Sequence, residues 1–404
     1  MKTKEFNLKE KNAKRSDHMA YLPQMEQIES DVMARVLEEM HNYDAGRYTE
    51  SDVMAALRKP SCSIENLKAL LSSAATPYLE AMAKRAHDET QKHFGNTVYL
   101  FTPLYIANYC ENHCVYCGFN ATNKIRRLRL NKEQMEREMQ IIAESGIEEV
   151  LLLTGESPTA SDVAYIGEAC QLARRYFRMV GLEIYPVNTE EYRYLRECGA
   201  DYVTVFQETY DSDLYETLHL RGPKRVWPYR FEAQERALMG GMRGVGFSAL
   251  FGLGDFRRDA LATALHAYFL QQKYPHGEVS LSCPRIRPTA TDQHFASQNV
   301  SEKDLCQIIC AYRIFMPYAG ITVSTRESAT FRRGIVKIAA TKLSAGVSTG
   351  IGDHEEKYTD AVIEDANAVG DAQFEISDSR SLQEVYDDLS VDGLQPVLND
   401  YLYV

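Results

Sequence analysis

The clearest chemical signal in this 404-residue chain is a CxxxCxxC spacing formed by Cys110, Cys114 and Cys117. Cysteine thiolates ligate iron–sulfur clusters, and a cubane normally takes four, so three local cysteines leave one iron open to a non-protein ligand. A zinc site and three unrelated core thiols are the alternative interpretations. His113 would be the fourth zinc ligand, but it lies between two of the cysteines and is poorly placed to complete a tetrahedron. The spacing therefore favours a cluster with an open iron.

Acidic and basic side chains follow further apolar runs of the sequence. They occupy residues 154–156, 207–208, 285–287 and 326–327, each directly after a predicted strand. In a β/α barrel the carboxyl ends of the strands converge at one mouth, where active sites lie. We therefore expect the cysteines, carboxylates and arginines to share a single cavity.

A scaffold that could position these residues is indicated from residue 98 onward, where short apolar runs alternate with amphipathic segments. Predicted strands cover residues 98–101, 149–153, 181–185, 202–206, 244–251, 279–282, 321–325 and 343–346. Predicted helices between them cover residues 132–145, 161–177, 190–197, 258–272 and 301–315. Eight strand–helix units in about 250 residues indicate an α/β fold of the (β/α)8 TIM-type barrel class, with a doubly wound open sheet as the alternative.

Two segments flank the predicted barrel, which we assign to residues 96–348. Residues 1–95 predict a helical N-terminal extension, because apolar residues such as Val36 recur at three- and four-residue spacing. Residues 349–404 form an acidic C-terminal cap, which we expect to be ordered because it retains apolar residues such as Leu389.

The formal charge of −12 is confined to the end of the chain, because residues 350–404 hold 14 acidic residues against two basic ones. The rest of the chain is balanced, so a general nucleic-acid binder is disfavoured. No apolar stretch reaches the roughly 18 residues needed to cross a bilayer, and the first 24 residues are too charged for a signal peptide. We expect a cytoplasmic protein with no membrane or nucleic-acid partner, whose cap offers a solvated acidic face to a basic partner.

The cysteine spacing, followed by Gly118 and Phe119 after the first predicted strand, resembles the radical S-adenosylmethionine (SAM) superfamily. Six further motifs narrow the resemblance: LFTPLYIANY (100–109), TGE (154–156), FQETY (206–210), SCPRIRP (282–288), STRES (324–328) and GLQPV (393–397). In this order they resemble the tyrosine lyases, or 2-iminoacetate synthases (the ThiH family of thiamine biosynthesis), in the aromatic-amino-acid lyase branch. The resemblance runs from about residue 20 to the C-terminus.

The resemblance implies that the three cysteines hold a [4Fe-4S] cluster whose open iron binds SAM. Gly155 and Glu156 would then hold the methionyl amino group of SAM, with Glu183 and residues 246–252 near its ribose and adenine. A helix N-cap is the alternative role for Glu156. The further cofactor-side candidates are Tyr116, Gln207 and Glu208.

An amino-acid substrate needs a fixed cation for its carboxylate, and arginine can engage both carboxylate oxygens at once. The resemblance assigns this role to Arg326, and a structural salt bridge to Glu327 or Glu208 is the alternative. The substrate-side candidates are Arg326, Ser324, Tyr105 and Arg285.

The reaction implied by the resemblance is cleavage of the Cα–Cβ bond of L-tyrosine to 2-iminoacetate (dehydroglycine) and p-cresol. The reduced cluster would cleave SAM to methionine and a 5′-deoxyadenosyl radical, which takes a hydrogen from tyrosine, at its amino nitrogen. The implied partners are L-tyrosine, thiazole synthase (ThiG) and a flavodoxin or ferredoxin reductant.

Two other functions stay open: a tryptophan lyase of the same branch, and a non-catalytic iron–sulfur or metal-binding scaffold. The three-cysteine count disfavours a scaffold, because electron-transfer clusters are usually fully ligated by the protein. A hydrogenase maturase of this branch carries a second cluster on additional C-terminal cysteines. Here no cysteine follows Cys310, so we do not expect that chemistry.

Overall fold

The computed structural model of the chain describes residues 15–289, 299–354 and 371–398. The first fourteen residues of the predicted extension, residues 290–298 of the predicted barrel, and residues 355–370 and 399–404 of the predicted cap lie outside these ranges.

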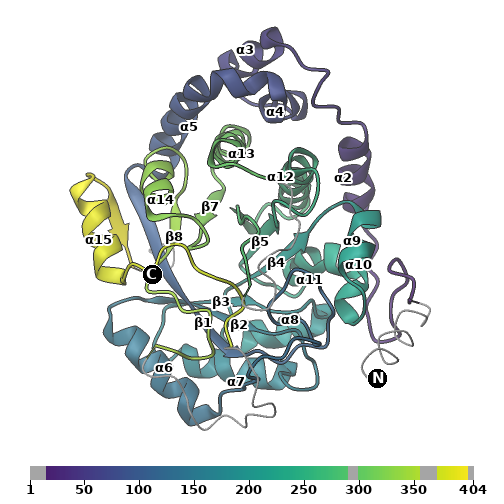
Figure 1. Cartoon of the computed structure of the whole chain (residues 1–404), viewed down its shortest axis with the longest axis vertical. Helices are drawn as coiled ribbons and strands as arrows, with labels where there is room; N and C mark the ends of the chain where they lie inside the picture. The colour runs from purple at the N-terminus through teal and green to yellow at the C-terminus, as the bar shows by residue number, and fades with distance from the viewer. Residues whose placement is uncertain (1–14, 290–298, 355–370, 399–404) are drawn as a thin grey trace, which may run out of the picture.

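Parallel strands β1 to β8 close into a barrel, which confirms the predicted (β/α)8 fold over an open sheet (Figure 1). The strand order runs from β2 to β8 and returns through β1 to β2. The strands are β1 (Thr97–Ala107), β2 (Glu149–Thr154), β3 (Met179–Glu183), β4 (Tyr202–Glu208), β5 (Gly244–Ala249), β6 (Glu278–Ser282), β7 (Gly320–Val323) and β8 (Lys342–Ser344). Each predicted strand is found, although β1 continues to Ala107 and does not end at Phe101.

Helices surround the barrel and connect its strands (Figure 1). They are α6 (Lys132–Glu144), α7 (Val163–Ala173), α8 (Thr189–Glu197), α9 (Ser212–Leu218), α10 (Trp227–Phe231), α11 (Ala233–Met239), α12 (Phe256–Lys273), α13 (Glu302–Phe315) and α14 (Ala329–Ile335), with a short 3₁₀ turn η2 (Pro223–Arg225). Several begin at a polar N-cap, such as Asn131 and Ser301, whose side chain accepts a first-turn N–H. Among the described helices none is long and apolar enough to cross a membrane.

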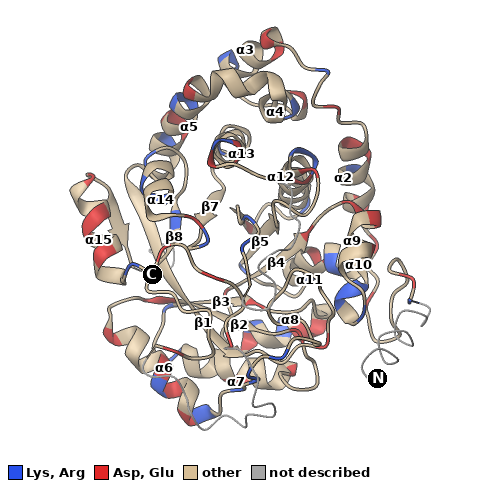
Figure 2. Ribbon diagram, in the orientation of Figure 1, with Lys and Arg blue, Asp and Glu red and all other residues tan. Residues whose placement is uncertain are grey.

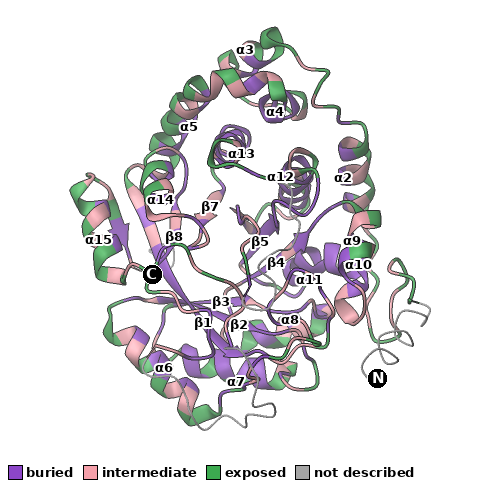
Figure 3. Ribbon diagram, in the orientation of Figure 1, coloured by how far each residue is buried: buried purple, intermediate pink, exposed green. Residues whose placement is uncertain are grey.

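The N-terminal extension forms a second helical layer outside α12 and α13, drawn as an arc in Figure 1. It consists of α2 (Val32–His41), α3 (Glu50–Arg58), α4 (Ile64–Leu71), η1 (Ser73–Tyr78) and α5 (Leu79–Phe94). This layer takes the outer faces of α12 and α13 out of water, so both are buried on nearly all sides (Figure 3). A covered outer face explains why α12 lacks the polar stripe of a surface helix.

The C-terminal cap contains α15 (Leu382–Val391) and a strand, β9 (Gln395–Val397), that the sequence did not predict. Strand β9 pairs in parallel with Thr97–Tyr99 at the start of β1, whereas β2 pairs with β1 only from Thr102 onward. Because Pro396 has no N–H to donate, it suits such a short strand at the rim of the sheet. Strand β9 therefore attaches the end of the cap to the amino-terminal end of the barrel.

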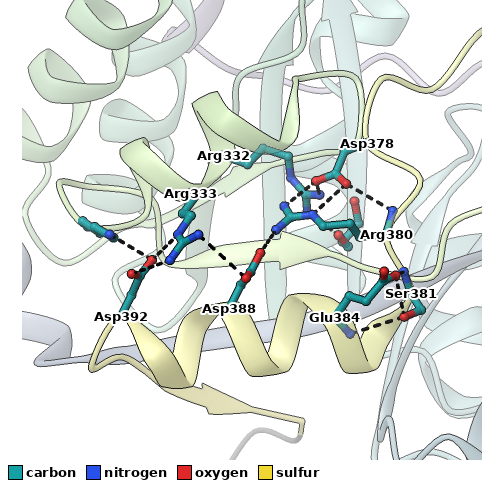
Figure 4. A network of polar contacts seen from close by, with 10 residues as sticks. Arg332, Arg333, Asp378, Arg380, Ser381, Glu384, Asp388 and Asp392 are labelled. Atoms are coloured by element: carbon teal, nitrogen blue, oxygen red, sulfur yellow. Dashed lines mark hydrogen bonds and ion pairs between the residues drawn. The ribbon is translucent and has the colours of Figure 1, made fainter.

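Figure 2 shows acidic residues along α15, and cations of the chain itself neutralise several acidic side chains of the cap (Figure 4). Asp392 lies 2.7 Å from Arg333 Nε and 2.9 Å from Lys337 Nζ. Asp388 pairs with Arg380. The acidic face that we predicted for a basic partner is thus partly occupied within the described cap.

One hydrophobic core runs through the extension, the barrel and the cap, and it includes Val36, Leu152 and Leu389. Figure 3 shows this burial in the strands and in the inward faces of the helices. The three predicted segments therefore pack against one another, and their exact boundaries stay predictions.

Candidate active site

The loop after β1 carries the cysteines to the carboxyl ends of the barrel strands. There Cys110, Cys114 and Cys117, none of which forms a disulfide, line a cavity of about 900 Å³. The backbone holds the loop from two sides: Glu111 N–H donates to the carbonyl of Glu156 at 3.0 Å, and Val115 N–H donates to the carbonyl of Leu218 at 3.1 Å. Because backbone groups fix the loop, the thiols stay available to the cavity.

The three thiols lie in buried surroundings. Burial raises the pKa of Cys110 to about 11 and that of Cys114 well above its usual value, so both are neutral thiols at pH 7 and ligation of a cluster would displace their protons. Two amide groups approach sulfur atoms: Asn112 Nδ2 lies 3.8 Å from Cys110 Sγ, and Gln373 Nε2 lies 4.0 Å from Cys117 Sγ. Within the described ranges no three His, Cys, Asp or Glu side chains converge on a single ion. A [4Fe-4S] cluster requires no such convergence, because each cysteine ligates a different iron, so the site fits it.

A charged cluster of two carboxylates and two cations forms the next part of the cavity wall. Glu156 Oε1 lies 2.9 Å from Arg230 Nη1 and 3.2 Å from Lys224 Nζ, while Asn112 Nδ2 donates to Glu156 Oε2 at 3.0 Å. Glu208, at the end of β4, lies 2.8 Å from Lys224 Nζ. Burial opposes ionisation of Glu156, but the two cations outweigh burial and lower its pKa. Glu156 is therefore a carboxylate at neutral pH.

The turn after β2 brings Glu156 against the cysteine loop. A Cβ on Gly155 would lie 2.2 Å from the carbonyl oxygen of Tyr109, so only glycine allows this approach. The N-cap role considered for Glu156 is wrong, because Asp162 caps α7 by accepting from Tyr165 N–H at 2.8 Å.

Lys224 and Arg230 are cavity residues that sequence reasoning missed. They come from η2 and α10, within the long connection between β4 and β5, and no motif marks them. The one available signal was chemical: two carboxylates predicted at one buried mouth require cations nearby.

Glu183 and Tyr116 also line this cavity, as predicted positions for cofactor contact. Burial raises the pKa of Glu183 to about 7, while the charge of Arg326 opposes the rise. The hydroxyl of Tyr116 lies 2.8 Å from His219 Nε2, and burial raises the pKa of Tyr116 well above its usual value. Glu183 can thus change charge near neutral pH, whereas Tyr116 is a neutral wall residue with its hydroxyl engaged.

A second cavity of about 820 Å³ lies within the barrel and adjoins the first. The two share Tyr105, Glu183 and Arg326 in their walls, and Ser324 lines the second. The structure therefore brings three of the four substrate-side candidates together, next to the cysteine-lined space.

Arg326 has no acidic partner in the part of the chain that the structure describes, where Glu327 and Glu208 pair with other cations. Its guanidinium carbon lies 3.5 Å from the centre of the Phe374 ring. Burial lowers the pKa of Arg326, and Tyr105 counteracts this effect. The salt-bridge alternative is therefore not realised, and the guanidinium borders both cavities.

Two predicted site residues do not line either cavity. Arg285 binds the Glu327 carboxylate, with Nε 3.0 Å from Oε1, and its Nη1 donates to the carbonyl of Val300 at 2.7 Å. On β4, Phe206 and Glu208 line the first cavity, whereas Gln207, which lies between them where the strand register is irregular, is buried and lines neither cavity. We therefore correct both assignments. Arg285, predicted on the substrate side, forms an ion pair with Glu327, and Gln207, predicted on the cofactor side, lies outside the cavity wall.

A further omission of the sequence analysis is the contribution of the C-terminal cap. Gln373 and Phe374 line the first cavity, and Phe374 also lines the second. No motif indicated them, because the sequence predicted only a solvated acidic face for the cap.

A (β/α)8 barrel whose CxxxCxxC loop follows the first strand and faces the mouth defines a radical SAM enzyme. Residues 104–267 match the Radical SAM superfamily, and residues 282–395 match the Biotin and Thiamin Synthesis associated domain.

Similar proteins assign the chain to a narrower family within this superfamily. It is 37% identical over 354 residues to the 2-iminoacetate synthase of Salmonella typhimurium, covering 87% of this chain and 91% of that protein. The Escherichia coli 2-iminoacetate synthase is 36% identical with the same coverage. The FeFe-hydrogenase maturase HydG from Carboxydothermus hydrogenoformans superposes with a TM-score of 0.83 at 27% identity, covering 94% of this chain and 87% of that structure. The chain belongs to the 2-iminoacetate synthase (ThiH) family, and this supports the lyase over the scaffold and tryptophan-lyase alternatives.

Proposed function

We propose that the two adjoining cavities bind a [4Fe-4S] cluster, SAM and L-tyrosine. The chain is a radical SAM carbon–carbon lyase that converts L-tyrosine to 2-iminoacetate and p-cresol, for the thiazole moiety of thiamine. Membership of the 2-iminoacetate synthase family supports the reaction, and the geometry of the cavities supports the residue assignments below.

The observation that best supports these assignments is that two cavities with different lining residues adjoin each other. One is lined by three cysteines, and the other lies inside the barrel beneath a guanidinium without an acidic partner among the described residues. A cofactor and an amino acid bound there would meet at the shared wall formed by Tyr105, Glu183 and Arg326. Such proximity converts an encounter between two reactants into a reaction within one complex.

On the cofactor side, Cys110, Cys114 and Cys117 would hold the cluster. When bound, the cluster and SAM supply the one-electron chemistry that removes a hydrogen atom from the substrate. Glu156 offers a carboxylate to the SAM ammonium, and it already accepts hydrogen bonds from cations in the same place. SAM also carries a carboxylate, and Lys224, which lies beside Glu156 in the cavity wall, would be a cation for that group.

On the substrate side, Arg326 binds the tyrosine carboxylate, with Ser324 and Tyr105 beside it. A charge-assisted fork of two N–H groups fixes the carboxylate in one orientation. The barrel interior then surrounds the phenol side chain and excludes water, which protects a reactive intermediate from side reactions. Glu183 stays our candidate for contact with the SAM ribose.

Two protein partners complete the proposal. A flavodoxin or ferredoxin delivers the electron, and thiazole synthase (ThiG) receives 2-iminoacetate, whose instability favours a short handover. Both assignments are carried by family membership.

An anaerobic assay tests the function. The reconstituted enzyme with dithionite, SAM and L-tyrosine should release 5′-deoxyadenosine and p-cresol, and L-tryptophan should yield no cleavage product. Cys114→Ala should abolish both products; if both persist, the cluster assignment is wrong. Arg326→Ala should keep the iron–sulfur absorbance and weaken tyrosine binding by about 30-fold to several thousand-fold, the effect of truncating a buried charge pair. Unchanged tyrosine binding would remove Arg326 from the site.

A further inference from the structure

A short piece of the C-terminal cap, residues 371–378, lies over the mouth of the barrel; we call it the C-terminal strap. Gln373 N–H donates to the carbonyl of Thr349 at 3.3 Å, after β8, and Ser377 N–H donates to the carbonyl of Thr325 at 2.8 Å, after β7. The strap therefore contacts the loops that follow two neighbouring barrel strands.

The strap reaches both sides of the candidate active site. The Gln373 side chain accepts from the Tyr105 hydroxyl at 2.8 Å and approaches Cys117 Sγ at 4.0 Å. The next residue, Phe374, places its ring 3.5 Å from the guanidinium carbon of Arg326. Two consecutive side chains thus connect the cysteine loop with the proposed carboxylate-binding arginine.

Buried ion pairs hold the strap at each end. At the start, Asp371 Oδ2 lies 2.6 Å from Arg126 Nη2, on the segment that follows the cysteine loop. At the other end, Asp378 pairs with Arg332 of α14 and lies 2.6 Å from Arg380 Nη2 (Figure 4). The strap is therefore an anchored part of the mouth.

The cysteine loop is built to accept the strap. A Cβ on Gly118 would lie 2.3 Å from the carbonyl oxygen of Gln373, so the strap passes where only glycine leaves room. Gly118, directly after the third cysteine, thus leaves the space through which the strap backbone passes.

We propose that Phe374 is a positioning residue that holds the Arg326 guanidinium ready for the tyrosine carboxylate. The proposal rests on the proposed function, in which Arg326 binds that carboxylate. An aromatic face attracts a cation through the negative potential of the ring, without occupying its N–H groups. A carboxylate in this place would instead compete with the substrate for the same N–H groups. The ring therefore keeps Arg326 oriented and its N–H groups available.

The test replaces the ring and measures tyrosine binding directly. Phe374→Leu keeps apolar bulk but loses the aromatic face, and Phe374→Tyr restores the face. Binding of L-tyrosine is measured by calorimetry on the reconstituted enzyme with SAM and without reductant, so that no turnover occurs. We expect Phe374→Leu to raise the dissociation constant and KM for tyrosine by about 2- to 30-fold with kcat nearly unchanged, the range of a cation–π contact. Phe374→Tyr should bind like the wild type.

The matched control is Glu375→Gln, because Glu375 follows Phe374 in the strap and its side chain is exposed. It should leave tyrosine binding and iron–sulfur absorbance unchanged. The proposal is overturned if Phe374→Leu binds tyrosine like the wild type, if Phe374→Tyr is impaired equally, or if Glu375→Gln weakens binding as much. In each of these cases wild-type release of p-cresol still supports the proposed function, and its failure in the wild type would count against the function itself.

Discussion

Anchoring of the C-terminal strap by Asp378 can be tested with a single substitution, Asp378→Asn. Asp378 is 2% exposed and Arg332 is fully buried, so the variant leaves a buried guanidinium beside a neutral amide. Removing one partner of such a pair costs about 3–5 kcal/mol. Arg380 is only partly buried and retains Asp388, so most of the cost falls on Arg332 (Figure 4).

The expected signal is faster amide hydrogen exchange in the strap. The amides of residues 377 and 378 donate to the carbonyl of Thr325 at 2.8 and 3.2 Å, and they exchange when the strap detaches. If the free energy of local opening of the strap falls by the full 3–5 kcal/mol, exchange should accelerate by about 150- to 4,000-fold, since each 1.4 kcal/mol is a factor of ten. Mass spectrometry of a peptide that spans the strap measures this rate.

The control for this experiment is Asp387→Asn, because Asp387 lies on the exposed face of α15 and accepts from Gln383 Nε2 at 2.8 Å. It should change exchange in the strap very little. An acceleration below tenfold in Asp378→Asn, or an equal one in the control, would refute the reasoning. Burial alone would raise the pKa of Asp378, but Arg380 and Arg332 lower it below 3.8. Its stabilisation is therefore complete above that pH and lost only at lower pH, so wild-type anchoring should not weaken between pH 7 and pH 5.

Three more predictions concern the cavity wall. Lys224→Met should lower the free energy of unfolding in urea by about 3–5 kcal/mol, since it leaves Glu156 buried with one cation fewer; a loss below 1 kcal/mol would contradict the charge network. Burial raises the folded-state pKa of Glu183 from 4.5 to about 7, so the wild type loses stability as pH rises from about 4.5 to 7, where the unfolded chain releases this proton before the folded chain does, and the loss is complete above pH 7. Glu183→Gln lacks this loss, so the melting temperature of the variant minus that of the wild type should increase from pH 5 to pH 8. A difference that stays constant over this range would argue against the raised pKa. Gly155→Ala places a methyl group 2.2 Å from the carbonyl oxygen of Tyr109, so it should displace the cysteine loop and lower the iron content after reconstitution; wild-type iron content would show that the loop tolerates it.

Local patterns in the sequence were sufficient for the barrel and for the place of its mouth. Apolar runs of strand length alternate with amphipathic helices, and parallel strands joined by helices must end on the same side, so residues after the strands meet there. Arg326 and Glu156 were placed at the mouth in this way, whereas the three cysteines were identified by their spacing, and all five line the first cavity. The charge count likewise located the acidic cap, because composition does not depend on folding.

Tertiary structure alone decided which charges pair and what covers the mouth. Glu327 binds Arg285, which removes Arg285 from the cavity and leaves Arg326 facing the aromatic ring of Phe374. Lys224 and Arg230 enter the cavity from a connection without a motif, and the strap reaches it from the far end of the chain. Periodicity and spacing report which face of its own element a residue occupies. The partner of a buried charge depends on which distant segments pack together, and only the folded chain determines that.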